Sequence, residues 1–492
     1  MDILEKMYNI IIGDNLQNVH LGNVPNWTKQ DKGENDMDKA RESALKVLYK
    51  IDVENGYSNI VLNDEIKSKK DGLNSKDIGL ISEIVYGVTT WKLTLDEIIK
   101  KYSKIRLKKI SPWIINILRM SIYQIIFLDK IPVSASVNEG VNLAKRYGNR
   151  GSIGFVNAVL RKVSKKDYEE LFNEKEELKR ISKTTSMPEW IIQRLKEDGL
   201  TVKEIEDICK NSNIKPKISI RTNNTKICKE DLKIRLEEKG ISSTDGILND
   251  FLILDKVKDI ENMEEFKSGL FTIQDEVAGL TALVLNPKPG EKVLDACSSP
   301  GGKTTYLAEI MCNKGKIEAW DIHEHRTKLV RNTAKRLNLE IISTNVQDAT
   351  IYNEKYKENF DKILLDVPCL GIGVLKRKPD IKWQKQENDI EEISKIQYEI
   401  LKTCFKYLKS GGKLVYSTCS ILKEENEKII EKFIKNNKNA VIENINFEES
   451  EKIKDEKNAE IFFTKYIKQN KYLQIYQNEK TDGFFICKIA KN

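Results

Sequence analysis

Two cysteines and an aspartate follow strand-like segments in the C-terminal half of the chain. The apolar run FDKILLD ends at Asp366, shortly before Cys369, and the run GGKLVYST is followed at once by Cys419. The carboxyl ends of parallel strands meet at one edge of a sheet, so we expect these side chains to converge. An ionised thiol is a nucleophile, and nearby lysines or helix N-termini favour the thiolate. The pattern predicts covalent catalysis, although two of eight cysteines can also share an edge by chance.

The segment KVLDACSSPGGKTTYLAEI, residues 292–310, reads as a strand, a small-residue turn and the start of a helix. Backbone N–H groups at such a junction, together with the positive end of the helix, bind a carboxylate or a phosphate. We therefore predict a ligand site at the turn, with an ordinary strand-to-helix connection as the alternative.

Three kinds of ligand loop are worth comparing with this turn. A phosphate-binding loop requires G-x-x-x-x-G-K-[ST], and Cys297 stands in place of its first glycine. The dinucleotide fingerprint G-x-G-x-x-G is absent. The S-adenosylmethionine (SAM) loop of methyltransferases tolerates small residues and needs an acid at the end of the next strand, where KIEAWDI supplies Asp321. The incomplete phosphate loop also argues against reading Asp366 as a magnesium ligand of a nucleotidase.

A thiol beside SAM fits the methylation of a pyrimidine carbon. Carbon 5 of cytosine attacks a methyl sulfonium poorly, whereas a thiolate that adds at carbon 6 produces an enamine that attacks it readily. A carboxyl group near the ring nitrogen holds the base and stabilises charge as the adduct forms. A base then removes the proton at carbon 5 and the thiolate leaves. These residue types predict cytosine-5 methylation with SAM as the donor.

The elements that would position this site alternate along the chain. The strand-like runs KVLDA, KIEAWD, EIISTN, DKILLDVP and GKLVYST are separated by helical sequence, which is typical of a parallel sheet with helices on both faces. We expect an α/β Rossmann-like catalytic domain over residues 271–492, with a mostly parallel seven-stranded sheet. A linker and small α+β module are expected over residues 167–270. Residues 1–37 are polar and aperiodic, which predicts a disordered extension.

Residues 38–166 are expected to form an all-α domain. Ser111 followed by Pro112 marks a helix start before a long apolar run. This segment has 24 Lys and Arg against 13 Asp and Glu, a net charge of +11, whereas the whole 492-residue chain carries +8. The stretch KKYSKIRLKK, residues 100–109, has six basic residues and a Tyr102 that can stack, which favours RNA contact over a merely solvated face.

Composition argues against several other classes. No apolar run reaches the roughly 20 residues needed to span a bilayer, and the N-terminus is acidic where a secretory signal is basic. The eight cysteines include no C-x-x-C pair and there are only three histidines, so no metal site is predicted. Scattered free thiols in a Lys-rich chain indicate a reducing cytoplasm.

Two resemblances add to these expectations. Residues 38–166 resemble the NusB-like RNA-binding domain in LRMSIYQ, VNEGVNLAK and GFVNAVLRKV. From residue 38 onward the chain resembles the Nop/Sun family of RNA cytosine-5 methyltransferases, in its bacterial small-subunit ribosomal RNA branch, whose members carry T-C-S and D-x-P-C motifs. The resemblance implies that Cys419 in YSTCS is the nucleophile, that Cys369 in DVPC assists release of the RNA, and that Asp366 contacts the base near the cofactor. DNA cytosine-5 methyltransferases use a cysteine after proline, so the two roles could be exchanged.

The Nop/Sun resemblance also implies a cofactor site and an RNA site. Asp321 would hold the ribose, Asp348 in NVQDAT would lie beside the adenine, and KRKPDIKW, residues 376–383, would shape the RNA site. Val367 and Leu370 depart from the usual D-A-P-C-S-G, which puts the role of the missing serine hydroxyl in question. The implied cofactor-binding residues are Cys297, Ser298, Ser299, Pro300, Gly301, Gly302, Lys303, Asp321, Asp348 and Asp366.

The expected protein is a cytoplasmic, monomeric, SAM-dependent methyltransferase of 16S ribosomal RNA that binds no metal and no membrane. Two alternatives stay open at this stage. One is a cytosine-5 methyltransferase of transfer RNA or another RNA, and the other is a non-catalytic RNA-binding assembly factor.

Overall fold

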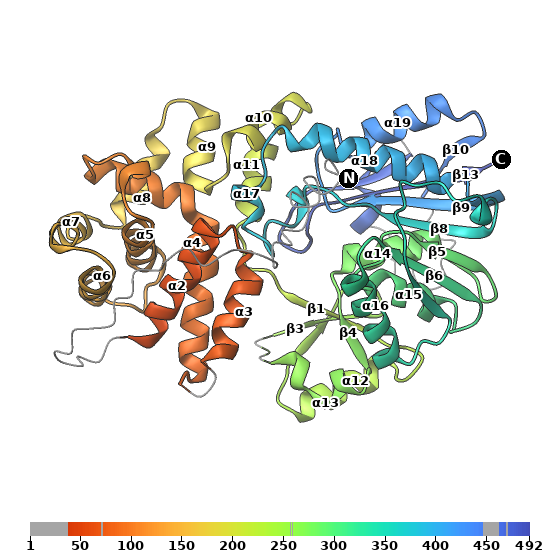
Figure 1. Cartoon of the computed structure of the whole chain (residues 1–492), viewed down its shortest axis with the longest axis horizontal. Helices are drawn as coiled ribbons and strands as arrows, with labels where there is room; N and C mark the ends of the chain where they lie inside the picture. The colour runs from red at the N-terminus through yellow and green to blue at the C-terminus, as the bar shows by residue number, and fades with distance from the viewer. Residues whose placement is uncertain (1–37, 70–71, 256, 258, 446–461, 469–470) are drawn as a thin grey trace. The chain divides into compact units, whose positions relative to one another are not determined.

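The structure is a computed structural model that describes residues 38–69, 72–255, 257, 259–445, 462–468 and 471–492 (Figure 1). The predicted extension, residues 1–37, lies outside the described residues. The chain divides into two compact units. Unit 1 joins the chain up to Asn213 with the later segment Leu375–Glu387, and unit 2 consists of Ile214–Val374 and Asn388–Asn492. The span expected as a linker and small module, residues 167–270, is therefore shared between the two units.

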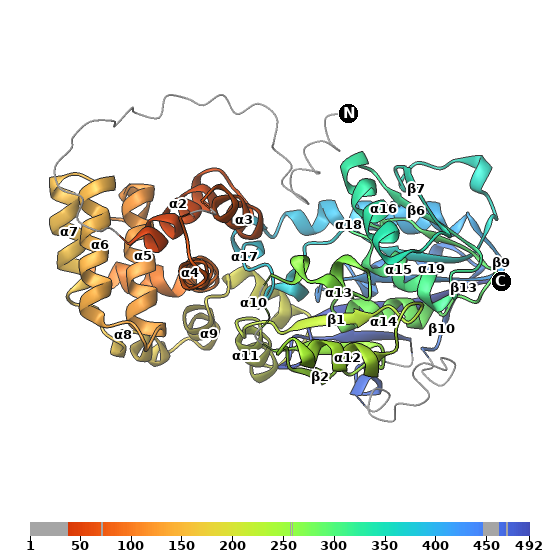
Figure 2. The same cartoon turned by 90° about the horizontal axis from the view of Figure 1, so that it is seen from below.

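Unit 1 is helical in its described residues. Its central helix, α5 (Pro112–Phe127), begins where the sequence predicts, because Ser111 Oγ accepts a hydrogen bond from the Ile114 amide and Pro112 occupies the first turn. All side chains of α5 from Ile114 to Ile126 are buried, and α6 and α7 pack beside it (Figure 2). The other helices are α2 (Lys39–Val53), α3 (Ser58–Ser68), α4 (Ser75–Tyr102), α6 (Val133–Tyr147), α7 (Arg150–Leu160), α8 (Lys166–Glu170), α9 (Glu177–Thr185), α10 (Glu189–Glu197), α11 (Val202–Asn211) and α17 (Ile381–Gln384).

The segment Leu375–Glu387 belongs to unit 1 because its side chains bind helices of that unit. Asp380 accepts hydrogen bonds from the amide and the hydroxyl of Ser58, at 3.3 and 2.8 Å, and so caps the N-terminus of α3 from a distant part of the chain. Lys382 is 1% exposed and donates to Asn213 Oδ1 at 2.6 Å. The indole of Trp383 donates to the Thr89 carbonyl at 2.6 Å. These polar contacts, together with the buried side chains of Leu375 and Ile381, hold the segment in place.

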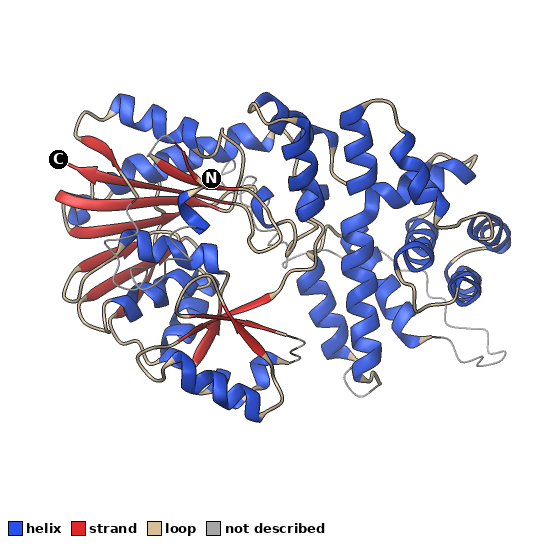
Figure 3. Ribbon diagram, turned by 180° about the vertical axis from the view of Figure 1, so that it is seen from behind, coloured by secondary structure: helices blue, strands red, loops and turns tan. Residues whose placement is uncertain are grey.

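Unit 2 is built on a large sheet, drawn in red in Figure 3. Its strand order is β11-β12-β13-β9-β8-β5-β6-β7, with β10 paired to β13. The five strands β7, β6, β5, β8 and β9 are parallel, and the rest are antiparallel. The described sheet thus has nine strands and not the expected seven, because short strands extend its antiparallel end. The strands are β5 (Lys292–Asp295), β6 (Lys316–Asp321), β7 (Ile342–Val346), β8 (Phe360–Asp366), β9 (Leu408–Thr418), β10 (Ala440–Glu443), β11 (Ile467–Lys468), β12 (Tyr472–Ile475) and β13 (Phe484–Lys491).

Helices cover both faces of this sheet, as Figure 1 shows. On one face lie α14 (Glu276–Leu285), α15 (Gly302–Ile310) and α16 (Glu324–Leu337); on the other lie α18 (Asp389–Phe405) and α19 (Glu427–Asn436). Successive strand residues enter different cores, because side chains alternate across a strand. Val293 packs with α14 and α15, whereas its neighbour Leu294 packs with α18. The doubly wound fold predicted from the sequence is confirmed.

A small antiparallel sheet forms the start of unit 2. Its order is β2-β3-β1-β4, from β1 (Ile218–Thr222), β2 (Ser243–Asp245), β3 (Phe251–Leu254) and β4 (Phe271–Ile273). Helix α12 (Lys229–Glu238) buries Leu232 and Leu236 in the same core as Ile220 and Leu252. A short helix, α13 (Glu264–Lys267), precedes β4. We refer to residues 214–273 as the small module.

Candidate active site

The sheet order brings the predicted site residues to one edge. In the parallel part, β9-β8-β5-β6-β7, the strand order reverses at β5, and ligands bind at the carboxyl ends of strands beside such a switch point. The turn at residues 297–303 follows β5, Asp321 ends β6, and Asp348 comes just after β7. On the other side Asp366 ends β8 and Cys419 directly follows β9. All the predicted residues therefore lie along the same edge.

The turn after β5 is tied to its neighbours by hydrogen bonds. The Ser298 amide and hydroxyl both donate to the Trp320 carbonyl in β6, at 2.8 and 2.9 Å. Gly301 has a φ of 106°, a left-handed conformation that favours glycine, and a Cβ atom there would lie 3.1 Å from Val330 Cα in α16. Helix α15 starts directly after it, so its first backbone N–H groups lie at the turn. Backbone N–H groups at a helix start suit an anionic or polar ligand group.

Asp295, at the end of β5, is a residue that the sequence motifs did not single out. Its carboxyl is buried and accepts a 2.7 Å hydrogen bond from the Thr304 hydroxyl in α15. Burial raises the pKa of Asp295 to about 7. This contact fixes the far end of the turn to β5. In the sequence, Asp295 is the first residue of the segment DACSSPGGKT.

Lys303 and Asp366 form an ion pair between the turn and β8. Lys303 Nζ lies 2.6 Å from Asp366 Oδ2, and the Ser417 hydroxyl donates to Asp366 Oδ1 at 3.1 Å. Burial lowers the pKa of Lys303, but the Asp366 carboxylate and Cys419 raise it more, so the net pKa is above its usual value. The ammonium form therefore persists between the turn and the two cysteine loops.

The two cysteines meet. Cys369 Sγ lies 3.1 Å from Cys419 Sγ, and both side chains are partly exposed. The hydrogen bond with Cys419, and then burial, hold the pKa of the Cys369 thiol well above its usual value. The raised pKa disfavours the thiolate form of Cys369. The geometry places two sulfur atoms in contact at the same edge as the turn.

Glu425 joins the two cysteine loops, and no sequence motif pointed to it. Its buried carboxylate accepts from the Leu370 amide at 2.9 Å and from the Ser420 hydroxyl, while Gln397 donates to it at 3.0 Å. Because the first contact uses the backbone N–H, Leu370 can replace the serine usual in the family without loss of this bond. In the sequence, Glu425 is one of three glutamates in the charged run KEENEK, which gives no indication that it is buried.

Gly373 provides a second link between these loops. Its amide donates to the Cys419 carbonyl at 2.8 Å, and its carbonyl accepts from the Gly483 amide before β13 at 2.8 Å. A Cβ atom on Gly373 would lie 2.6 Å from the Cys419 carbonyl oxygen. The loop GIG after Cys369 is therefore packed directly against the backbone of the other cysteine.

The two remaining acids are held by turns at the strand ends. Asp321 is 5% exposed and its Oδ1 accepts from the His323 amide at 3.2 Å. Asp348 Oδ1 accepts from the amide and hydroxyl of Thr350, at 2.8 and 2.6 Å. The two carboxylates lie at the ends of successive strands and can accept hydrogen bonds from a diol. The N–H groups of the neighbouring turn can donate to a carboxylate of the same ligand. SAM has both groups, so these residues fit the predicted cofactor.

The predicted basic segment in unit 1 is only partly available. Lys100 pairs with Glu97, and Lys101 pairs with Asp167 and Glu170. The Tyr102 hydroxyl donates to Asp167 at 2.6 Å. The four basic side chains of residues 104–109 are exposed and keep the segment a candidate RNA contact.

Within the described residues, no cluster of three or more histidine, cysteine or acidic side chains is arranged to hold a metal ion. The same part of the chain has no helix that is both long and apolar enough to cross a membrane.

The strand order, the turn at the switch point and the helical first unit define a Rossmann-like methyltransferase with a NusB-type domain. Family models match residues 38–165 as the NusB family, 187–261 as the ferredoxin-like domain of RsmF/B-like methyltransferases, and 282–490 as 16S rRNA methyltransferase RsmB/F. The chain belongs to the ribosomal RNA small subunit methyltransferase B family.

Individual relatives support this membership over most of the chain. A "Probable ribosomal RNA small subunit methyltransferase B" of Bacillus subtilis is 36% identical over 92% of this chain and 98% of its own length. The ribosomal RNA small subunit methyltransferase B of Shewanella oneidensis is 32% identical over 80% of this chain and 89% of its own length. A crystal structure of a protein named PH0851 matches with a TM-score of 0.74 and 26% identity, over 94% of this chain and 100% of that one.

Proposed function

We propose that this methyltransferase of small-subunit ribosomal RNA transfers a methyl group from SAM to carbon 5 of a cytosine in 16S ribosomal RNA, through a covalent cysteine adduct. The observation that carries the proposal is the 3.1 Å approach of Cys369 Sγ and Cys419 Sγ at the sheet edge that holds the turn. A methyl transfer to a nitrogen or a hydroxyl requires no thiol, whereas a pyrimidine carbon requires a nucleophile that first adds to the ring.

In this mechanism Cys419 adds to carbon 6 of the cytosine. The raised pKa of Cys369 disfavours a thiolate at that position, which favours Cys419 as the attacking sulfur. The charge of Cys419 raises the pKa of Lys303, and this interaction is reciprocal. The Lys303 ammonium therefore also favours a negative charge on the Cys419 sulfur. The proton of the Cys419 thiol would pass to the ring nitrogen as the adduct forms. Asp366, with one oxygen on Lys303, would then accept a hydrogen bond from that nitrogen and stabilise its charge. The target base has to leave its stack to reach these groups.

SAM, when bound at residues 297–303, supplies a methyl group on a positive sulfur. Asp321 would hold the ribose of the cofactor and Asp348 would lie beside its adenine. Transfer of the methyl group to carbon 5 would release S-adenosylhomocysteine as a neutral thioether. The ring then carries a methyl group and a proton at carbon 5 and the Cys419 sulfur at carbon 6. Loss of that proton, with cleavage of the carbon–sulfur bond, restores the aromatic base.

Cys369 fits the removal of the proton. Its pKa is raised first by the hydrogen bond with Cys419. Once Cys419 is bonded to carbon, its negative charge is gone and its sulfur is only a weak acceptor. The pKa of Cys369 therefore falls when the adduct forms, so that Cys369 can release its proton to solvent and the resulting thiolate can take the proton from carbon 5.

The test compares Cys369→Ala with Cys419→Ala, with Cys404→Ala as the matched control because Cys404 is a buried cysteine of the same unit. With 16S ribosomal RNA and labelled SAM, Cys369→Ala is expected to accumulate a covalent RNA adduct that survives denaturing electrophoresis. Cys419→Ala is expected to form none, and the control to turn over normally. The reverse pattern would exchange the roles of the two cysteines.

Other outcomes decide between the remaining alternatives. Methyl transfer to transfer RNA but not to deproteinised ribosomal RNA or to ribosomal particles would change the substrate. Absence of methyl transfer to any of these RNAs would favour a non-catalytic assembly factor. Bisulfite sequencing of ribosomal RNA from a deletion strain would identify the modified cytosine.

A further inference from the structure

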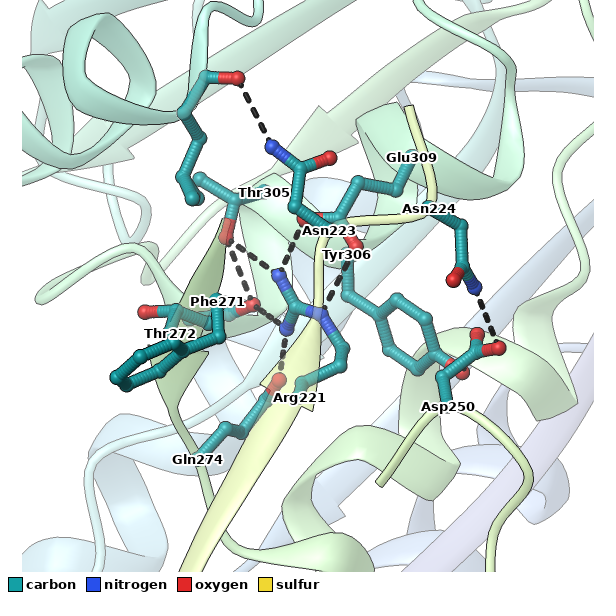
Figure 4. A network of polar contacts seen from close by, with 12 residues as sticks. Arg221, Asn223, Asn224, Asp250, Phe271, Thr272, Gln274, Thr305, Tyr306 and Glu309 are labelled. Atoms are coloured by element: carbon teal, nitrogen blue, oxygen red, sulfur yellow. Dashed lines mark hydrogen bonds and ion pairs between the residues drawn. The ribbon is translucent and has the colours of Figure 1, made fainter. Parts of the chain in front are cut away.

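Arg221 of the small module is a fully buried charge that the catalytic chemistry above does not use. It lies on β1, its side chain is 0% exposed, and its guanidinium points toward α15, the helix that follows the turn (Figure 4). A buried guanidinium is costly unless every N–H is paired, so its partners define what it does.

The partners of Arg221 are concentrated on α15. Its Nε and Nη2 atoms donate to the two carboxylate oxygens of Glu309, at 3.0 and 2.8 Å, in a bidentate pair. Nη2 also donates to Thr305 Oγ1 at 3.1 Å, and the guanidinium stacks 4.4 Å from the Tyr306 ring centroid.

One contact reaches the turn itself. Arg221 Nη1 donates to the Gly302 carbonyl at 2.9 Å, and also to the Gln274 side chain. Gly302 is the first residue of α15 and lies between Gly301, with its left-handed backbone, and Lys303, which pairs with Asp366. The arginine therefore holds the peptide that sets the direction of both the turn and the Lys303 side chain.

A second arginine docks the small module without touching the turn. Arg336, near the end of α16, donates to the Phe266 and Phe271 carbonyls at 2.6 and 2.9 Å, and its guanidinium stacks on Phe266. Arg336 thus extends from the sheet domain to the small module, whereas Arg221 extends from the module to α15. Both arginines dock the module, but only Arg221 also contacts Gly302.

We propose that Arg221 is a positioning residue for the SAM turn: the small module fixes the backbone at Gly302 so that the cofactor meets a preformed site. This role rests on the proposed use of SAM by residues 297–303. It assigns to the small module a part in cofactor binding, separate from any part in RNA binding.

The experiment compares two substitutions at Arg221 with a matched control in the full-length chain. Arg221→Lys keeps the charge beside Glu309 but cannot also reach the Gly302 carbonyl. The double variant Arg221→Met/Glu309→Met replaces the buried pair by apolar groups of similar size, which preserves folding. Arg336→Met is the control, because it removes a half-buried arginine at the same contact surface and leaves Gly302 untouched.

SAM affinity by calorimetry and KM for SAM and for RNA are measured well below the unfolding temperature. Both Arg221 variants are expected to weaken SAM binding and raise KM for SAM about tenfold, the effect of losing one charge-assisted hydrogen bond. KM for RNA should stay within about twofold, and Arg336→Met should bind SAM as the wild type does.

Unchanged SAM affinity in both Arg221 variants would overturn the proposal. So would an equal loss in Arg336→Met, because docking alone would then explain it. A wild-type chain that binds no SAM would refute the proposed function itself, and this role with it.

Discussion

Replacing Lys382 by methionine is expected to stabilise unit 1 at neutral pH and to destabilise it at alkaline pH. Lys382 is 1% exposed, and its ammonium donates to Asn213 Oδ1 at 2.6 Å and to the Thr90 carbonyl at 3.3 Å. No carboxylate is among these partners. Burial lowers the pKa of Lys382 from 10.5 to about 7, and the nearby Cys209 offsets this only in part.

The magnitude follows from the difference in pKa between the folded and the unfolded chain. Between pH 7 and pH 10.5 the unfolded chain binds more protons at this site, so stability rises with pH. At pH 7 the buried lysine costs roughly 4–5 kcal/mol, and near pH 10 the cost falls to about 1 kcal/mol. Methionine removes this cost but leaves two oxygens without a donor, which costs about 1–3 kcal/mol. The net effect is about 2 kcal/mol of stabilisation at pH 7 and about 1 kcal/mol of destabilisation at pH 10.

Urea denaturation of the full chain, followed by circular dichroism at 222 nm, measures this effect at both pH values. Trp383→Phe is the matched control, since it removes the 2.6 Å bond to the Thr89 carbonyl from the same segment but no ionisable group. The control should lose stability equally at both pH values. A Lys382→Met effect of one sign and one size at pH 7 and pH 10 would refute the reasoning.

Three further predictions concern unit 2 and the basic segment. Gly373→Ala should abolish methyl transfer and lower the stability by about 1–3 kcal/mol, because its Cβ would lie 2.6 Å from the Cys419 carbonyl oxygen; normal activity with an unchanged melting temperature would contradict this. Burial raises the pKa of Glu276 to about 7, so its ionisation lowers stability as pH rises from 4.5 through 7. Glu276→Gln, which can still accept from the Leu248 amide, should raise the melting temperature at pH 8 and hardly at pH 5; an equal rise at both would exclude a charge effect. Changing the four basic residues of 104–109 to glutamine should flatten the dependence of log K on log salt by up to about 3 in RNA-binding assays, and an unchanged slope would remove this segment from the contact.

The sequence was sufficient to predict the fold class because its signals are local. Short apolar runs alternate with amphipathic helical sequence from residue 292 onward, and the structure confirms a mostly parallel sheet. Ser111 and Pro112 start α5 as expected. The count of strands differed, since β11 has two residues and β10 has four, which is too short for an alternating pattern. The roles of Cys369 and Cys419 stay predictions, although their sulfurs do meet.

The features that the sequence did not reveal depend on contacts between distant residues. Arg221 and Glu309 are 88 positions apart, and Leu370 and Glu425 are 55 apart. Charged side chains read as surface residues in a sequence, and only a tertiary partner shows that they are buried. The segment 375–387 is the clearest case, because KRKPDIKW is strongly polar yet contains the fully buried Lys382.

That segment also affects when the nascent protein can finish folding. The ribosome has to add 174 residues after Asn213 before Glu387 is made, which takes about 10–35 s at roughly 5–20 residues per second. During this interval α3 has no Asp380 at its N-terminus and Asn213 has no lysine to bind. Unit 1 is thus the first domain to be synthesised but among the last to be completed. When its final segment docks, the ribosome has already translated Cys369.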